Sequence, residues 1–273
     1  MPLVDLIILS LIQGLTEFLP ISSSGHLVLV HQFFDHDSLS TSRLLDIAVH
    51  LGTLLSVLVY LHKDILQMLK NLITFGRGQQ DNYKLLMALI VASLPVIVCG
   101  FILNAYTPSW LVDPVVIATT MIVFALFLWW SDKAPQAYTS LDYLTLRQAL
   151  WIGIAQVLAL IPGTSRAGIT MTAGRFLGYS RVEAARFSLL LGCVAIAGAG
   201  TLGGYDLYTH VQDTGEIQIG IDAALAFILS FFAGWISIAL MMSWIAKTDF
   251  KVFVVYRLGL GTLLFALIGF DIL

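Results

Sequence analysis

The chain consists largely of long apolar runs that are separated by short polar loops. Six of these runs approach the ~20 residues that a helix needs to cross a bilayer, allowing for tilt. They lie roughly at 44–61, 85–103, 115–130, 187–204, 223–245 and 252–270. The runs lack the alternation of apolar and polar residues that marks an outer-membrane β-strand. The pattern therefore predicts an all-α polytopic membrane protein with six transmembrane helices.

Two further apolar regions, 3–34 and 149–177, are each broken in the middle by a proline. Pro20 interrupts the first region, and Pro162 with Gly163 interrupts the second. Proline cannot continue a helix, and the serines that follow Pro20 are preferred caps for a new helix. Each arm is too short to cross a membrane alone, so we expect two re-entrant helical hairpins. Irregular backbone at this depth is tolerated only inside protein or beside a water-filled cavity.

The two halves of the chain resemble each other at an offset of 142 residues, which places the break at Pro20 over the break at Pro162. Each half then contains one broken hairpin and three spans. We therefore interpret the chain as one membrane domain with a repeat at about 1–133 and a second at about 142–273. Two units of three crossings insert in opposite orientations, so the repeat has inverted topology. Such a repeat brings the two hairpins face to face near the midplane of the membrane.

Composition supports the membrane interpretation. Hydrophobic residues make up 58% of the chain and charged residues only 11%, against about 25% charge in a typical soluble domain. The net charge of −3 argues against a nucleic-acid partner. The lipid bilayer is therefore the expected environment.

Lysine and arginine are distributed unevenly between the loops. The loops that contain them lie at 61–84, 131–147, 175–186 and 246–252, and the loops that lack both lie at 104–114 and 205–222. By the positive-inside rule the basic loops are cytoplasmic, which places both termini outside. The first hairpin then enters from outside and the second from the cytoplasm. Arg43 is the one basic residue that falls on the outer side.

Polar residues gather at the first break, in Gln-Gly-Leu-Thr-Glu-Phe-Leu-Pro-Ile-Ser-Ser-Ser-Gly-His at 13–26. Ionisable groups at membrane depth normally face a cavity or a partner and point to a functional site. Gln13 and Glu17, four residues apart, share one helix face, and Ser23 and His26 share a face of the next helix. We expect the break to bring together a carboxylate, a hydroxyl and an imidazole. The alternatives are a Glu17 that serves structure alone and a satisfied core histidine.

The second break reads Ile-Pro-Gly-Thr-Ser-Arg-Ala-Gly-Ile-Thr at 161–170. Small residues at a new helix N-terminus present N–H donors to an anion. Arg166 adds a planar, permanently charged fork that suits phosphate. The expected anion ligands of this segment are therefore Gly163, Thr164, Ser165, Arg166 and Thr170. The alternative is an Arg166 buried against carbonyls or snorkelling, with Thr170 hydrogen-bonded to its own helix.

Asp46, His50 and Arg257 also lie inside predicted spans. Asp46 and His50, four residues apart, can line the same cavity as the first break, and the alternative for Asp46 is an acid at a helix end near the interface. Arg257 lies near the cytoplasmic end of the last span, where we expect its side chain to snorkel to the membrane surface.

The two polar motifs, at 13–26 and 162–170, resemble the signature motifs of the undecaprenyl-diphosphate phosphatase family of the bacitracin-resistance type. The resemblance extends to Asp-Ile-Ala-Val-His-Leu-Gly-Thr at 46–53 and to the Tyr256-Arg257 pair, so it covers essentially the whole chain. The chain departs from the family at Ala167, where serine is frequent. It also departs at Gln13, where relatives carry glutamate, and this weakens a role for that position as a second carboxylate ligand.

The resemblance implies a hydrolase that converts undecaprenyl diphosphate to undecaprenyl phosphate and inorganic phosphate. It would thereby recycle the lipid carrier for peptidoglycan and cell-wall synthesis, and it is associated with antibiotic resistance. The implied location is the bacterial cytoplasmic (inner) membrane, with the active site opening to the outer, periplasmic side. The protein partner considered is a second copy of the same chain, in a homodimer. A transporter or flippase for a polyprenyl phosphate lipid would suit the inverted repeat equally well but needs no nucleophile.

For this reaction the resemblance implies Ser23 as nucleophile and His26 as base or acid, with His26 as the alternative nucleophile. Glu17 would orient this pair or bind a divalent cation, Mg²⁺ or Ca²⁺, held largely by substrate oxygens and water. Arg166 would stabilise charge on the transferred phosphoryl group. The remaining residues expected to bind substrate are Gln13, Ser22, Ser24, Gly163, Thr164, Ser165 and Thr170.

Overall fold

The computed structural model describes residues 2–33, 39–73, 80–106, 108–214, 217–270 and 272. Throughout these ranges the chain is helical, apart from turns, loops and one isolated bridge between Tyr138 and Tyr179. The α-helices are α1 (Leu3–Thr16), α2 (Ser23–Phe33), α3 (Leu39–Tyr60), α4 (His62–Ile73), α5 (Gln80–Ala105), α6 (Pro114–Asp132), α7 (Leu146–Val157), α8 (Arg166–Phe176), α9 (Arg181–Thr214), α10 (Ile217–Ile245) and α11 (Lys251–Gly269). Short 3₁₀ segments lie at η1 (Ser109–Val112), η2 (Leu141–Tyr143) and η3 (Leu158–Leu160).

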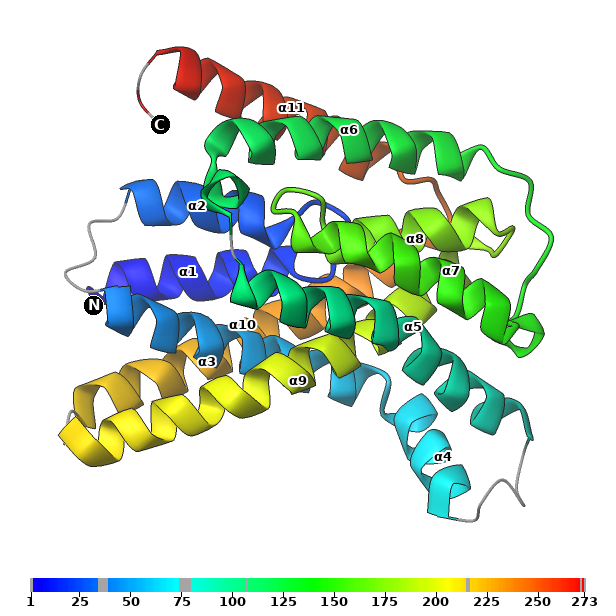
Figure 1. The fold of residues 1–273 in the computed structure, drawn as a ribbon, viewed down its shortest axis with the longest axis horizontal. Helices are drawn as coiled ribbons and strands as arrows, with labels where there is room; N and C mark the ends of the chain where they lie inside the picture. Colours follow the sequence, from blue (N-terminus) through cyan, green and yellow to red (C-terminus); the bar gives the residue numbers. More distant parts are fainter. Residues whose placement is uncertain are drawn as a thin grey trace.

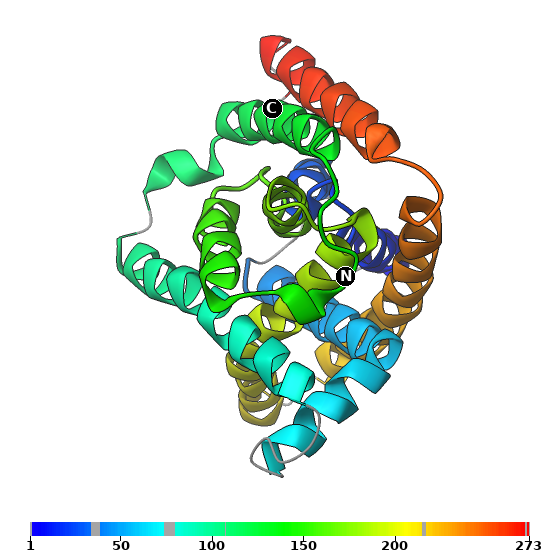
Figure 2. The same cartoon turned by 90° about the vertical axis from the view of Figure 1, so that its right-hand side faces the viewer.

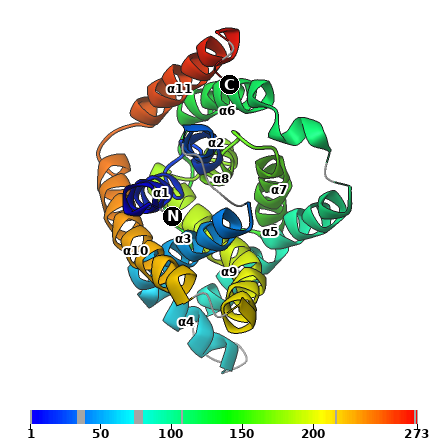
Figure 3. The ribbon, with the colours of Figure 1, turned by 90° about the vertical axis from the view of Figure 1, so that its left-hand side faces the viewer.

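Most helices run along the longest axis of the molecule (Figure 1), and end-on views show the longer helices arranged around α2 and α8 (Figures 2 and 3). Within the described ranges, four stretches are long and apolar enough to cross a membrane: 83–103 of α5, and the whole of α6, α10 and α11. The pair formed by α3 and α4 passes the same test together and is bent by 81°. The predicted all-α, multi-pass membrane protein is therefore confirmed.

Both proline-containing regions form helical hairpins, as expected. α1 ends at Thr16 and α2 begins at Ser23, while α7 ends at Val157 and α8 begins at Arg166. In Figure 1, α1 and α2 extend inward from the end marked N, and α7 and α8 extend inward from the opposite end. The tips of the two hairpins thus meet in the middle of the molecule.

The two tips share an uncommon backbone conformation. Ser22 has φ 75° and Ser165 has φ 70°, and they are the only non-glycine residues with positive φ in the described part of the chain. Each lies directly before the first residue of a helix, α2 or α8. Left-handed conformations are rare for residues with a side chain. The equivalent tip positions are 143 residues apart, one more than the offset that aligns Pro20 with Pro162.

The two halves of the chain pack against each other through their hairpins. α1 packs along α10, and α7 packs along α5, so the first arm of each hairpin lies against a long helix from the other half. Close approach depends on small residues: a Cβ added at Gly14 would lie 2.5 Å from the Cβ of Ala233, and one added at Gly153 would lie 2.4 Å from the carbonyl oxygen of Ala92. Of the remaining long helices, α3 packs chiefly along α10 and also along α9, and α6 packs along α11.

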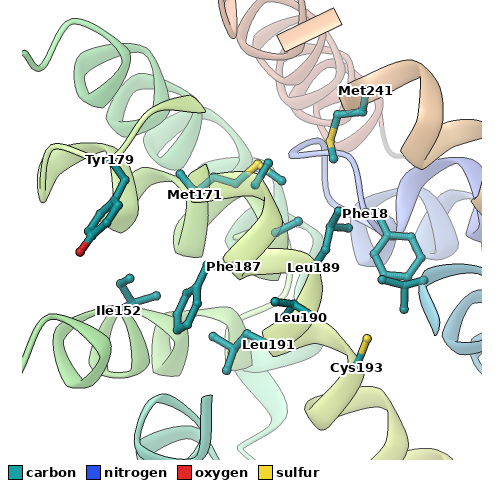
Figure 4. Packing of buried hydrophobic residues seen from close by; sticks show 14 of the residues in the cluster. Phe18, Ile152, Met171, Tyr179, Phe187, Leu189, Leu190, Leu191, Cys193 and Met241 are labelled. Carbon is teal, nitrogen blue, oxygen red and sulfur yellow. The ribbon is translucent and has the colours of Figure 1, made fainter. Parts of the chain in front are cut away.

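The largest apolar cluster lies beside the hairpin tips (Figure 4). Phe18, which follows Glu17 in the chain, is fully buried in this cluster. The cluster also takes in the buried face of α9 at Phe187, Leu190 and Leu191, and Met171 of α8. Burial of large side chains at these positions stabilises the fold and holds the first tip against the helices that carry the second.

Candidate active site

The two hairpin tips contact each other directly. The backbone N–H of Gly163, in the second tip, donates to Ser24 Oγ of the first at 3.1 Å. Arg166 Nη2, at the start of α8, donates to Glu17 Oε1 at 2.9 Å. The N-termini of α2 and α8 therefore approach the same region, and helix N-termini favour bound anions.

Glu17 is the centre of the polar junction. Its side chain is only 8% exposed, and its two oxygens accept hydrogen bonds from three side chains. Oε1 accepts from Arg166, while Oε2 accepts from Gln13 Nε2 at 2.8 Å and from Ser23 Oγ at 3.0 Å. A buried carboxylate needs such partners. Gln13 and Glu17 therefore share one helix face, as predicted. The Ser23 hydroxyl belongs to the same hydrogen-bonded cluster as the Glu17–Arg166 ion pair.

Arg166 is positioned by α9. Its Nη1 donates to the Ser188 carbonyl at 3.5 Å, and the absence of a side chain at Gly192 leaves room for the guanidinium, because a Cβ there would lie 2.1 Å from Nη1. Thr170 hydrogen-bonds to the Arg166 carbonyl at 2.8 Å and to Ser188 Oγ at 2.7 Å. The structure thus places Thr170 behind the start of α8, where it bonds to its own helix and to α9.

His26 forms its hydrogen bonds with residues other than Ser23. Its Nδ1 is 2.7 Å from the Ser22 carbonyl oxygen and its Nε2 is 2.6 Å from the Tyr256 hydroxyl. A carbonyl oxygen only accepts, so Nδ1 carries a proton, and in the neutral ring Nε2 accepts from Tyr256. The rings of His26 and Tyr256 stack at 5.5 Å with an interplanar angle of 9°. Ser23 is therefore hydrogen-bonded to Glu17, whereas His26 is hydrogen-bonded to Ser22 and Tyr256.

Arg257 is fully buried, so the prediction that it snorkels is wrong. Its guanidinium donates to the carbonyl oxygens of Gly163 and Thr164 at 2.9 Å each, and to that of Pro20 at 3.3 Å. The helix breaks leave these tip carbonyls without helical partners, and buried carbonyls require a donor. A single arginine from α11 therefore holds both tips together.

Other predicted residues shape the second tip and the serine triplet. Ser165 caps α8 by accepting from the Gly168 N–H at 3.1 Å, and Ser22 Oγ lies 3.1 Å from Ser24 Oγ. Thr164 is completely buried. Gly163 has φ +84°, and a Cβ there would lie 2.2 Å from Thr120 Oγ1. This position therefore requires glycine.

A cavity of about 330 Å³ lies beside the junction, lined by Asp46, Ile47, His50, Ala195, Ile196 and Gly200. Asp46 and His50 line one cavity, as expected, but none of the residues at 13–26, all of which the structure describes, is among its lining residues. His50 Nδ1 is 2.6 Å from the Asp46 carbonyl oxygen, which directs Nε2 toward Glu17, 4.0 Å from Oε2. The cavity therefore lies between α3 and α9, and His50 both lines it and approaches the carboxylate.

Tyr256 and Arg257 contact the junction but are not among the site residues that the sequence predicts. Tyr256 bonds His26, and Arg257 bonds both tips. Their signals in the sequence are a polar pair inside an apolar span and the resemblance of that pair to the family. Arg257 makes its hydrogen bonds to residues more than 90 positions away in the chain. No local sequence pattern indicates contacts over that distance.

The donors that could bind a divalent cation are few. Within the described ranges, no group of three or more histidine, cysteine, aspartate or glutamate side chains has the spacing of a metal site. Beside Glu17, the buried amide oxygen of Gln13 has no hydrogen-bond partner among the described atoms. One carboxylate and one amide oxygen fit a hard cation that takes its other ligands from phosphate oxygens and water.

Comparisons with known proteins cover nearly the whole chain. The family model described as Bacitracin resistance protein BacA matches residues 6–263. The chain is 43% identical over 266 residues to a protein named undecaprenyl-diphosphatase from Alteromonas mediterranea, covering 97% of this chain and 98% of the relative. Proteins of the same name from Chromohalobacter salexigens and Saccharophagus degradans are 42% and 40% identical, covering 94% and 99% of this chain and 95% and 100% of the relatives.

Proposed function

The chain belongs to the family of the bacitracin resistance protein BacA, and from this premise we propose that it is an undecaprenyl-diphosphatase. It hydrolyses undecaprenyl diphosphate to undecaprenyl phosphate and inorganic phosphate, and it thereby recycles the lipid carrier for cell-wall synthesis. The observation that supports this reaction most directly is that Glu17 accepts hydrogen bonds from Ser23 of one tip and from Arg166 of the other.

Ser23 is the nucleophile in this proposal. Its Oγ attacks the terminal phosphorus while its proton passes to Glu17 Oε2, 3.0 Å away. The bond from that phosphorus to the bridging oxygen breaks, and the leaving undecaprenyl phosphate takes the proton from Glu17. Water then attacks the phosphoserine, Glu17 accepts a water proton, and Ser23 Oγ recovers it as inorganic phosphate departs. This is nucleophilic catalysis with a carboxylate base.

Charge on the transferred phosphoryl group is stabilised by Arg166 and by the N-termini of α2 and α8. Preorganised donors of this kind need no reorganisation during the reaction. His26 is a positioning residue in this scheme, because its hydrogen bond to the Ser22 carbonyl supports the left-handed turn directly before Ser23. The occupied nitrogens of His26 favour Ser23 over His26 as nucleophile.

A divalent cation, Mg²⁺ or Ca²⁺, is also part of the proposal. Glu17 and the Gln13 amide oxygen would hold it beside the diphosphate, with substrate oxygens and water as the other ligands. When bound, such an ion neutralises phosphate charge.

We further propose that α3, α5, α6, α9, α10 and α11 cross the membrane, with α1–α2 and α7–α8 as re-entrant hairpins of an inverted repeat. The reciprocal packing of α1 on α10 and α7 on α5 supports this arrangement. The described parts of the loops rich in lysine and arginine lie at one end of the molecule (Figure 1), which supports a cytoplasmic assignment in the inner membrane. The cavity beside His50 would then open toward the periplasm. A homodimer stays a prediction.

Release of phosphate from undecaprenyl diphosphate by purified protein in detergent tests the proposed function. A phosphatase releases one phosphate for each undecaprenyl phosphate formed. A transporter or flippase would leave the diphosphate intact in detergent, and that result would overturn the proposal.

A further inference from the structure

The helix α4 leaves the bundle at a steep angle. It is bent by 81° from α3, and Figures 1 and 2 show it extending outward at the end where the basic loops gather. If α3 crosses the bilayer, a helix bent by this angle lies close to the membrane plane. With the orientation proposed above, α4 then lies at the cytoplasmic end of the bundle.

Three different faces run along α4. The protein-facing side carries Asp64, Met68 and Asn71, of which Met68 and Asn71 are buried. A second, apolar face is strongly exposed and consists of Leu66, Leu69, Leu72 and Ile73, which are 61%, 51%, 51% and 78% exposed. A third, polar face is also exposed and carries Lys63, Gln67 and Lys70. This division is typical of a helix that lies in a membrane interface.

The rotation of α4 about its own axis is fixed by a two-point contact with α9. Arg186 Nη2 lies 2.6 Å from Asp64 Oδ1, and Arg186 Nε lies 2.9 Å from Asp64 Oδ2. A bidentate pair of this kind sets direction as well as distance. Because Asp64 faces the bundle, the leucine face is held toward the surroundings.

An apolar pocket of about 170 Å³ lies where α4 meets the bundle. Ile65, Met68, Leu69 and Leu72 form its α4 side, and the rest is lined by Leu58, Leu86, Leu89, Ile90, Leu190, Cys193 and Val194. A pocket without polar lining gains nothing from water, whereas hydrocarbon fills it favourably. The surroundings of α4 therefore suit lipid chains.

We propose that α4 is an interfacial helix that rests on the cytoplasmic leaflet of the bilayer. Its leucine face enters the boundary between headgroups and acyl chains, and Lys63 and Lys70 lie at the level of anionic headgroups, which attract basic side chains. A hydrocarbon chain of a leaflet lipid occupies the pocket below α4. The proposal rests on the membrane-spanning architecture and is independent of the phosphatase reaction.

Spin labels on the two exposed faces test the proposal. Cys99 and Cys193 are first replaced by alanine, and single cysteines are introduced as Leu69→Cys on the apolar face and Gln67→Cys on the polar face. The labelled proteins are placed in bilayers of phosphatidylethanolamine and phosphatidylglycerol. Collision with oxygen reports lipid, and collision with a water-soluble nickel chelate reports solvent. We expect the Leu69→Cys label to meet mainly oxygen and the Gln67→Cys label mainly nickel.

A second pair, Leu66→Cys and Lys63→Cys, repeats the comparison one turn earlier. The conclusion then does not depend on one variant that fails to fold. The thermal unfolding temperature of each labelled protein, compared with that of the cysteine-free parent, serves as the check that it is folded. Equal access of nickel to both faces would mean that α4 projects into the cytoplasm. Equal protection of both faces from nickel would mean that it is enclosed by protein or lipid. Either result overturns the proposal.

Discussion

Arg166 Nη2 lies 2.9 Å from Glu17 Oε1, although the two residues are 149 positions apart in the chain. The pair joins the tips of two helical hairpins that enter the molecule from opposite ends (Figure 1). Both side chains are largely buried, and an ion pair in this setting gives weak evidence for stability alone. We infer that the pair instead serves the site, because the same carboxylate accepts hydrogen bonds from Arg166 and from the Ser23 hydroxyl.

We expect Arg166→Lys to retain the fold and lose most of the activity. Lysine keeps the charge but cannot contact Glu17 and a phosphoryl group with a planar fork. Loss of such a donor costs roughly 3–4 kcal/mol of transition-state stabilisation, a factor of about 10²–10³ in rate. Phosphate release by purified protein measures the effect. Arg147→Lys, at an exposed position of α7, should remain close to wild type. An Arg166→Lys variant with full activity would remove the guanidinium from the mechanism.

Tyr256→Phe should reduce activity modestly. The phenyl ring keeps the stacking on His26 and loses the hydrogen bond to Nε2, and one such bond contributes about 1 kcal/mol net. A fall of roughly fivefold in kcat, with KM little changed, follows if His26 positions the turn at Ser22. Tyr143→Phe, at an exposed tyrosine, is the matched control. A loss as deep as that of a nucleophile variant would instead assign His26 and Tyr256 to the chemical steps.

Arg257→Met should act mainly by lowering the stability of the fold and not by slowing the chemical step. Methionine leaves the carbonyls of Pro20, Gly163 and Thr164 without their donor, and each buried unsatisfied group costs about 1–3 kcal/mol. The expected result is a marked fall in the thermal unfolding temperature of the detergent-purified protein. Arg147→Met provides the exposed comparison. An unchanged unfolding temperature would show that the tips are held together by other contacts.

Chelation should abolish phosphate release, and added Mg²⁺ or Ca²⁺ should restore it. The expectation follows from Glu17 and the unpartnered amide oxygen of Gln13 beside a diphosphate site. Full activity in excess chelator would leave Glu17 as a proton acceptor only.

The sequence predicts the parts of this structure that depend on local pattern. Pro20 and Pro162 break apolar helices because proline cannot continue them, and the charge of Glu17 and Arg166 inside apolar runs indicates a common site. The sequence does not predict that Arg257 is buried. An arginine near a helix end snorkels by default, and its burial depends on carbonyls freed 94 and 237 positions away. The Tyr256–His26 contact, across 230 positions, is hidden for the same reason.

Phosphate release by Ser23→Ala tests most directly whether the meeting point of the hairpin tips is the catalytic site. The substitution removes one hydroxyl and leaves Glu17 bonded to Gln13 and Arg166, so the fold should persist. We predict a fall in kcat on the order of 10⁴–10⁶, as when a nucleophile is removed from a unit of this kind, while Ser243→Ala on the exposed face of α10 behaves as wild type. A folded Ser23→Ala protein that releases phosphate at the wild-type rate would contradict the account.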